Sequence, residues 1–331
     1  SSSHGMRLLM HTGGCANAEL EVALRLVGDP IDVVSGAQVE RLVDARVRGH
    51  AQLIVWRRYD SSKVHEDRGL GPGHAWEFDE ELVLDLEGYS FRCGDGNTYT
   101  FGPLDVVGTS AIDRGWVLRR ADVDRFEITR GAEPKRLFVR SRRSPDRAKL
   151  VSLGEGTAVV TFEYDGEQLR RIASLEHAID VEWANDHVVR LVYHALGEDG
   201  HRRPHELASY RYDSAWNLAE IVDFYKGVHR REYDARHRVV RRIDARGYAI
   251  DFAYDASGRC IRSGGHDGVL RVDLEDHPKE RRTVVTRSNG GKTEYHYDAS
   301  GTVTKIVDAV GGVTEYEVTD GRVVAATDPA G

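Results

Sequence analysis

The chain has few of the residues that build cross-linked, metal-bound or membrane-spanning proteins. Only three cysteines occur in 331 residues, and Cys15, Cys93 and Cys260 form no CxxC pair. This spacing argues against a disulfide framework and a zinc motif, and predicts buried or inert thiols in a protein that folds in a reducing cytosol. No run approaches the roughly 18 apolar residues of a membrane helix, and no signal peptide is visible.

Positive charge is not in excess either. The chain has 46 Lys and Arg residues against 54 Asp and Glu residues, for a net charge of −8, which argues against general nucleic-acid binding. Seven of the 46 are Lys, so 39 are Arg, whose planar guanidinium suits pairing with carboxylates across strands. A GC-rich genome would give the same bias. With 40% hydrophobic residues, the chain can form a core in one large domain or two.

Catalytic motifs are missing as well. The sequence contains no GxSxG, HExxH or phosphate-binding glycine loop. His201 and His205 are four residues apart, but Pro204 prevents the helical face that would make them a metal site, so we expect a solvated loop. Glu163 and Asp165 share a strand face, but nothing indicates a pocket for acid/base chemistry. We therefore expect no catalytic residue, no metal and no cofactor.

The chain does have an internal repeat. A Tyr-Asp pair recurs, with steps of 21 residues between its three most regular copies. In the second half of the chain the pairs are Tyr164-Asp165, Tyr212-Asp213, Tyr233-Asp234, Tyr254-Asp255 and Tyr297-Asp298. The step of 43 residues before the last pair leaves room for a degenerate copy. Weaker copies run through residues 183–189 and 316–324.

Each repeat is expected to form a β-hairpin. The residues before the pair alternate apolar and polar, as in 248–254 and 293–297, which is typical of a half-buried strand. The Asp then begins a turn with Gly, and a second strand follows, as in 238–243. Stacked hairpins stabilise one another, so the Tyr rings are predicted to pack structurally. A row of exposed, sugar-binding tyrosines is the alternative, and burial of the rings distinguishes the two.

The first 150 residues lack this period but retain strand character. Residues 51–59 and 81–86 are predicted strands, 18–27 a short helix, and 130–146 a loop or a seam between regions. The chain is accordingly divided into a start at 1–11, which includes an expression-tag-like stretch at 1–6, a β-rich segment at 12–150 and a repeat array at 151–331.

The second half resembles the Rhs/YD repeats of bacterial polymorphic toxins and, more distantly, teneurins and Tc-toxin components. The first half resembles the segment that introduces an Rhs core. The residues that carry this second resemblance are Asp29, Pro30, Asp32, Gly36, Trp56, Arg57, Arg58 and Tyr59, then Gly69–Gly73, Trp76, Asp95, Gly96 and Phe101. The resemblance covers residue 28 to the end.

The resemblance implies an all-β fold in which a spiralling antiparallel sheet of stacked hairpins forms a shell around a toxic domain. The role would be structural and non-catalytic. Because the repeats are few and the sequence stops within a unit at Asp328–Gly331, we expect a partial shell, from a truncated chain or a short member of the family. Its expected partners are a toxin cargo, further repeats at an open sheet edge, or a second copy of itself.

A second hypothesis is a cell-surface recognition module that binds glycan or a partner protein through the repeat surface. In either case the resemblance implies synthesis in the bacterial cytoplasm and export by a secretion system, such as type VI, in interbacterial competition. We expect no nucleic-acid partner and no membrane segment in this chain.

Overall fold

The computed structural model describes residues 23–48, 52–196, 201–319 and 322–327. Strands dominate these residues, and the named helical elements are two short 3₁₀ turns, η1 (Ser61–Lys63) and η2 (Gly156–Ala158). The all-β prediction is confirmed, and so is a large antiparallel sheet. No helix within the described ranges is long and apolar enough to cross a membrane.

The first strands form two small units before the main sheet. They are β1 (Leu26–Val27), β2 (Ile31–Asp32), β3 (Val39–Val47), β4 (Leu53–Asp60) and β5 (His74–Trp76). β1 pairs with β2, and β3, β4 and β5 form a three-stranded sheet. The helix predicted at 18–27 is confirmed over residues 23–25 and wrong at 26 and 27, where Val27 pairs with Ile31 around a turn at Gly28; residues 18–22 lie outside the described residues.

The next strands curl into a lobe. They are β6 (Glu81–Leu84), β7 (Tyr89–Arg92), β8 (Thr98–Phe101), β9 (Ser110–Asp113), β10 (Trp116–Arg120), β11 (Arg125–Thr129), β12 (Arg136–Arg140) and β13 (Arg147–Leu153). β6 pairs with β13, which brings the two ends of the lobe together. The loop predicted at 130–146 is wrong in its middle: β12 forms there because Phe138 is buried against the ring of Phe91.

The repeats continue from β13 as one antiparallel meander. Its strands are β14 (Val160–Asp165), β15 (Gln168–Ala173), β16 (Ala178–Ala184), β17 (His187–Leu196), β18 (Arg202–Tyr212), β19 (Leu218–Asp223), β20 (Val228–Tyr233), β21 (Val239–Ile243), β22 (Ala249–Tyr254), β23 (Cys260–Gly265), β24 (Val272–His277), β25 (Arg282–Arg287), β26 (Lys292–Tyr297), β27 (Val303–Val307), β28 (Val313–Thr319) and β29 (Arg322–Thr327). The sequence division at 150 and 151 falls inside β13, so the lobe and the repeats share a strand.

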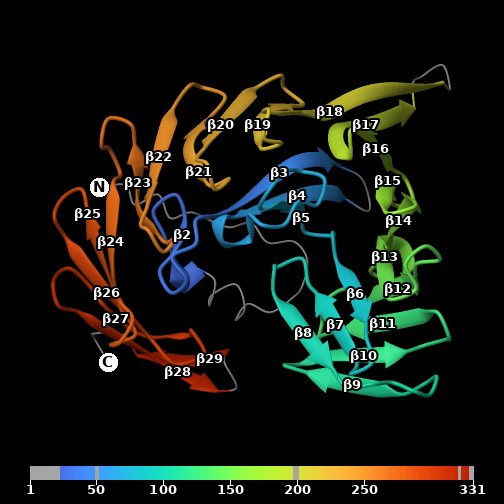
Figure 1. Ribbon diagram of the computed structural model, residues 1–331, viewed down its shortest axis with the longest axis horizontal. Coiled ribbons are helices and arrows are strands. Elements are labelled where there is room, and N and C mark those ends of the chain that lie inside the picture. Colours follow the sequence, from blue (N-terminus) through green and yellow to red (C-terminus); the bar gives the residue numbers. More distant parts are fainter. Residues whose placement is uncertain (1–22, 49–51, 197–200, 320–321, 328–331) are drawn as a thin grey trace.

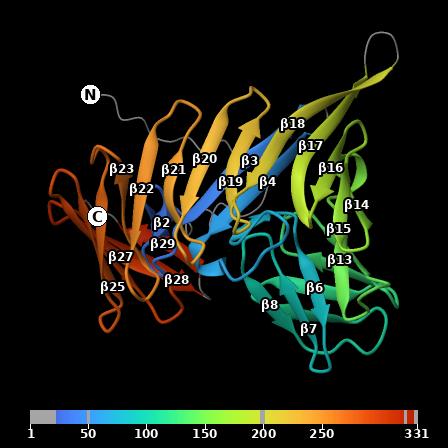
Figure 2. The ribbon, with the colours of Figure 1, turned by 45° about the horizontal axis from the view of Figure 1, so that its top comes forward.

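The meander curves around the first strands. Figure 1 shows β3, β4 and β5 inside the curve, with β13 to β29 around them, and Figure 2 shows the same nesting from another side. The expected loop at 201–205 is wrong from residue 202, because Pro204 lies in β18 opposite His194 of β17, where the exposed strand tolerates a proline.

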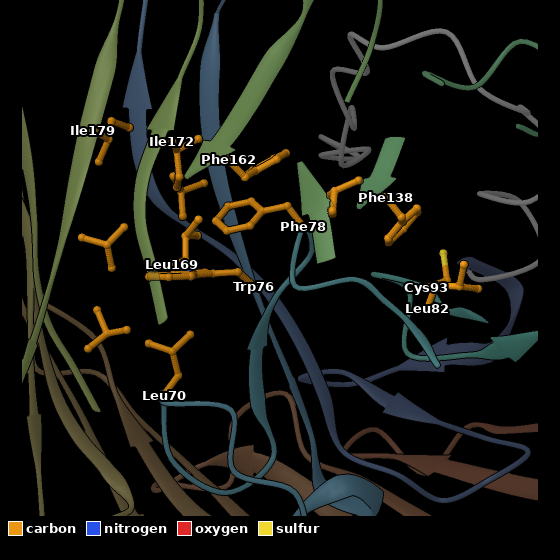
Figure 3. Close-up of a cluster of buried hydrophobic side chains, with 14 of the residues drawn as sticks. Leu70, Trp76, Phe78, Leu82, Cys93, Phe138, Phe162, Leu169, Ile172 and Ile179 are labelled. Carbon is orange, nitrogen blue, oxygen red and sulfur yellow. The ribbon is translucent and has the colours of Figure 1, made fainter. Parts of the chain in front are cut away.

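Apolar residues from both parts fill the space between them. Phe78, which follows β5, packs on Phe162 of β14 with ring centroids 5.1 Å apart. Figure 3 shows Phe78 and Trp76 facing Leu169 and Phe162 of the repeat sheet. The introducing segment, which we define as residues 28–101, is therefore part of the same core as the repeats.

Candidate functional site

Each Tyr-Asp unit contains the same β-bulge. The register shifts immediately before the Tyr, so that the Tyr lies opposite a buried residue and the next strand carries one extra residue. Tyr233 lies opposite Val239 in this way, and Tyr254 lies opposite Cys260. The same shift precedes Trp183 of the weaker copy.

The aromatic side chain of a unit hydrogen-bonds to the preceding hairpin. The hydroxyl of Tyr254 donates to the carbonyl of Val239 at 2.9 Å, 15 residues earlier, and Tyr233 donates to Leu218 at 2.8 Å across the same separation. The other bonds of this kind run from Tyr164 to Leu150, from Trp183 Nε1 to Leu169 and from Tyr212 to Val188. Tyr297 departs from the pattern, since its hydroxyl meets Asp276 Oδ1 at 3.3 Å.

We call this hydrogen bond, from a Tyr or Trp side chain to a carbonyl of the preceding hairpin, a latch, and two of its acceptors have a second role. Leu218 and Val239 are also the buried residues opposite the Tyr of their own hairpins. One residue thus packs against its own tyrosine and receives the hydroxyl of the next one. The rings of the five tyrosines of the Tyr-Asp pairs are half-buried rather than displayed on the surface, which favours the structural role over a sugar-binding row.

The Asp of the pair holds the turn that follows it. Asp298 Oδ1 accepts the backbone N–H groups of Ser300 and Thr302 at 2.8 and 3.0 Å. Asp213, Asp234 and Asp255 accept in the same way from residues two or four further on. Three residues after Asp255, Gly258 has a φ of +96°, as expected for glycine in this turn. Asp165 differs, because a tight turn pairs it directly with Gln168.

The opening residues of the introducing segment bind β23 of the repeat array and the turn before it. The backbone N–H of Cys260 donates to the Gly36 carbonyl at 2.7 Å, and Arg259 donates to the carbonyl of Ser35 at 3.0 Å. Asp32 accepts the N–H of Val34 and so shapes this loop, while the Pro30 carbonyl accepts from Val39.

Asp29 marks the start of the same contact. Its N–H donates to Ser263 Oγ of β23 at 3.3 Å, and its carboxylate lies 3.9 Å from Arg242. Burial raises the pKa of Asp29 and outweighs the opposing effect of Arg242.

The WRRY residues of β4 alternate between the two faces of their strand. Arg57 and Tyr59 are buried against the repeats, and the N–H of Val239 donates to the Tyr59 hydroxyl at 2.9 Å. Trp56 and Arg58 face the other way: the Trp56 ring lies under the Arg41 guanidinium, and Arg58 Nη1 lies 3.4 Å from Asp60. Of these four residues, only Arg57 and Tyr59 therefore face the repeats.

A hydrogen-bonded chain crosses from the introducing segment into the sheet. Arg57 donates to Asp44 Oδ1 at 3.0 Å and to His74 Nδ1 at 3.1 Å. Because a guanidinium can only donate, His74 Nδ1 accepts and Nε2 carries the proton, which it donates to the Tyr233 hydroxyl at 2.9 Å. Tyr233 in turn donates to Leu218, so every member of the chain is satisfied. Asp44 also accepts from the Tyr210 hydroxyl at 2.8 Å.

A buried ion cluster lies beside this chain. Glu40 Oε2 accepts from Arg231 Nη2 at 2.9 Å, and Glu40 Oε1 accepts from Arg242 Nη1 at 2.9 Å. Burial alone would raise the pKa of Glu40, but the two guanidiniums outweigh it and lower that pKa to about 2. His74 has no such anion: burial and then the charges of Arg57 and Arg231 lower its pKa well below the usual value.

The glycines of Gly69–Gly73 let the introducing segment reach the turns of the repeats. The Gly69 carbonyl accepts from the Val188 N–H at 2.8 Å, and a Cβ on Gly69 would strike the Trp183 ring. Gly71 has a φ of +83°, and its Cβ would lie 2.7 Å from the Trp216 carbonyl oxygen. Side chains at these positions would therefore separate the two parts.

Sequence reasoning missed the partners in these contacts. Glu40, Asp44, His74, Arg231 and Arg242 were not singled out. One signal was available for Arg231, which lies two residues before Tyr233 and so shares its inward face.

The contact between the introducing segment and the repeat sheet, which we call the seam, also contains a cleft of about 360 Å³. Its floor includes Leu70, Phe78 and Leu169, and its walls carry charges that are paired with one another, such as Lys149 with Glu81 at 3.0 Å. Among the described residues, no group of three or more His, Cys, Asp or Glu side chains could hold a metal ion. Cys93 and Cys260 are buried, and burial raises the pKa of the Cys260 thiol to about 12; Cys15 lies outside the described residues.

These features define a repeat protein whose curved sheet is latched from hairpin to hairpin and holds an earlier segment of its own chain. Two family models match it: a domain of unknown function (DUF6531) over residues 28–101 and the RHS Repeat over residues 233–265. The chain is therefore similar to proteins of the Rhs/YD-repeat family in these two stretches.

One curated relative is a probable deoxyribonuclease RhsB from Dickeya dadantii (strain 3937). It is 29% identical over 126 residues, which is 38% of this chain and 9% of the relative. The chain therefore spans a small part of that protein.

Solved structures of Tc-toxin components are also similar in arrangement. The crystal structure of TcdB2-TccC3-Cdc42 gives a TM-score of 0.40 at 10% identity, covering 88% of this chain and 23% of the other. A Photorhabdus luminescens Tc holotoxin pore gives 0.35 at 11% identity, covering 84% and 16%.

Proposed function

We propose that this chain is a non-catalytic wall segment of an Rhs-type β-shell, which encloses a toxin for delivery in interbacterial competition. The observation that carries the proposal is that the concave side of the repeat sheet already binds a polypeptide. The introducing segment meets the sheet from Tyr210 in β18 to Thr283 in β25, whose hydroxyl donates to the Val33 carbonyl at 2.6 Å.

The chemistry of this contact suits the enclosure of polypeptide in general. Apolar side chains bury surface without requiring a particular bonding geometry. Polar side chains satisfy backbone groups of the enclosed segment, as Arg259 does for the carbonyl of Ser35. The wall would hold cargo by the same two means, and it needs no catalytic group. Export by a secretion system, type VI among them, is part of the proposal.

Photo-cross-linking to an unfolded probe tests the enclosure. The probe is reduced, carboxymethylated α-lactalbumin, a permanently unfolded polypeptide. A photoreactive amino acid replaces Leu169, which lines the cleft on the inner side, or Glu182, whose neighbour Val181 points inward so that Glu182 points outward. We expect cross-links from position 169 and few from position 182. Equal labelling, or labelling mainly from 182, would refute enclosure on the concave side.

A further inference from the structure

The cleft at the seam opens between two turns of the repeat sheet. Glu167, in the turn between β14 and β15, and Asp186, in the turn between β16 and β17, both line the cleft and are exposed. The loop 67–70 lines it from the introducing segment. The volume of about 360 Å³ is at the lower end of ligand sites in proteins, which begin at about 300 Å³. One long side chain can therefore enter at the turns without displacing a strand.

The floor of the cleft is apolar. Leu70 of the introducing segment and Leu169 of β15 line it, and Figure 3 shows both near Trp76, which lines it as well. The Trp183 ring belongs to the same floor and lies against Gly69, where a Cβ would come within 2.3 Å of the ring. Such a floor favours a ligand that covers it with an apolar stem.

The charged side chains around the floor fall into two groups. In the first group every carboxylate has a Lys or Arg partner. Lys149 lies 3.0 Å from Glu81 and 2.9 Å from Glu167, and Arg68 pairs with Asp79. An anionic ligand would meet these carboxylates, and a cationic ligand would compete with the partners that they already have. The first group therefore attracts neither kind of ligand.

The second group consists of Asp67 and Asp186, which we call the acidic pair. Neither forms an ion pair with a Lys or Arg of the described residues. Asp186 accepts the side-chain amide of Gln168 at 3.3 Å, and Asp67 meets His187 Nε2 at 2.8 Å. Because His187 follows Asp186 in the chain, the two carboxylates lie on the same side of the cleft, which is also the side of the Trp183 ring. Carboxylates and the face of an indole ring both attract a cation.

We infer that this cleft binds a lysine or arginine side chain of the polypeptide that the wall encloses, a step that rests on the proposed function. The aliphatic stem would cover Leu70 and Leu169, and the charged head would lie at the acidic pair beside Trp183. Lysine and arginine are the side chains that carry a positive charge at the end of a long apolar stem. A wall with such a site favours segments that combine apolar and basic residues, and it requires no particular fold of the enclosed polypeptide.

Small ligands with one common alkyl chain test the site without any enclosed polypeptide. Hexylammonium, hexanol and hexanoate share a six-carbon chain and differ in the charge of the head group, and methyl NMR spectra report their binding at Leu70 and Leu169. We expect hexylammonium to shift both sets of methyl signals, and to bind at least about fivefold more tightly than hexanoate at the same salt concentration. Absence of shifts at both leucines, equal binding of the three ligands, or a preference for hexanoate would overturn the proposal.

Asp186→Asn tests where the charged head lies. Asparagine keeps an acceptor for Gln168 and tolerates the φ of +61° at this position, so the variant should fold. It should bind hexylammonium about threefold more weakly than the natural chain. Asp267→Asn is the matched control, because Asp267 is an exposed carboxylate in the turn between β23 and β24, and its affinity should not change. Unchanged affinity in the Asp186 variant, or equal loss in both variants, would overturn the role of the acidic pair.

Enclosure of a polypeptide and binding of its basic side chains can fail separately. Cross-linking from position 169 to unfolded α-lactalbumin reports enclosure whichever side chain enters the cleft, and hexylammonium reports the cleft when no polypeptide is present. We expect the α-lactalbumin residues labelled from position 169 to lie next to lysine or arginine in its sequence. Labelling without regard to these residues would overturn the assignment of the cleft to a basic side chain of the enclosed polypeptide.

Discussion

His74 Nε2 donates to the Tyr233 hydroxyl at 2.9 Å, and this bond joins the introducing segment to the latch of a repeat. The other ring nitrogen accepts from Arg57, so the imidazole is neutral in the folded protein. A second proton would place an N–H against the guanidinium. The seam is therefore built around a neutral histidine.

We predict that His74 makes the protein less stable as the pH falls below about 6.5. Burial and the charges of Arg57 and Arg231 lower the pKa of His74 in the folded state. The unfolded chain therefore binds a proton that the folded chain does not, and folding free energy is lost at up to about 1.4 kcal/mol per pH unit below that value. His74→Gln, which keeps an acceptor and a donor, should flatten this slope in urea titrations between neutral and mildly acidic pH.

His65→Gln serves as the control, because the His65 side chain is 69% exposed. An unchanged slope in the His74 variant would contradict a neutral, buried His74.

Glu40 gives the opposite kind of test. Although burial opposes it, the pull of Arg231 and Arg242 lowers the folded pKa of Glu40 to about 2. The lowered pKa contributes stability on the order of 3 kcal/mol. This stability is present in full above the pKa of Glu40 in the unfolded chain, and it is lost as the pH falls toward the pKa in the folded protein. Urea midpoints measured from pH 7 to pH 3 should fall more steeply for the natural chain than for Glu40→Gln.

At pH 7 we expect Glu40→Gln itself to destabilise the fold by about 3 kcal/mol, because it leaves the buried guanidinium of Arg231 without its anion and removes one of the two carboxylates near Arg242. A variant as stable as the natural chain would show that the cluster is solvated instead.

The latch predicts a modest, specific cost for removing one hydroxyl. Tyr254→Phe leaves the Val239 carbonyl without its donor and should destabilise the fold by about 1–2 kcal/mol in urea unfolding. Tyr225→Phe is the matched control, since that ring is exposed, and its effect should lie within about 0.5 kcal/mol of zero. If both variants lost the same stability, the hydrogen bond from Tyr254 to Val239 would not stabilise the fold.

Two glycines with nearly the same φ allow the cost of backbone strain to be measured apart from the cost of a steric clash. Gly71 and Gly247 have φ values of +83° and +85°, but only at Gly71 would a Cβ meet a backbone oxygen, while nothing lies within 4 Å of it at Gly247. Gly247→Ala should cost about 1 kcal/mol for the left-handed conformation alone, and Gly71→Ala about 3 kcal/mol or more. Thermal unfolding measures both, and similar costs would mean that the 69–73 loop does not press on the turns.

The sequence predicted what is local and missed what is set by register. Each Asp turn could be foreseen because the side chain bonds backbone groups two to four residues away. The Tyr latch could not, because its acceptor lies 15 residues back on the neighbouring strand, at a position set by the pairing of the two strands. Pro204 suggested a loop where an exposed strand forms.

The family resemblance identified Arg57 and Tyr59, but it did not identify the residues that they and their neighbours contact across the seam. Val239 lies 180 residues from Tyr59 and Arg231 lies 191 from Glu40, so neither contact leaves a trace in local pattern. Buried ion pairs in strands also look like solvated faces in a sequence of 30% charged residues. The contacts of the seam could therefore be identified only from the folded structure.

The central claim is that the concave side of the repeat sheet holds a polypeptide as part of one folded unit. Native-state hydrogen exchange tests it most directly at two amides of the sheet that donate across the seam, those of Val239 and Cys260. We predict that both exchange with the same free energy as the sheet amides around them. Early exchange of these two amides, while the rest of β21 and β23 stays protected, would contradict the claim.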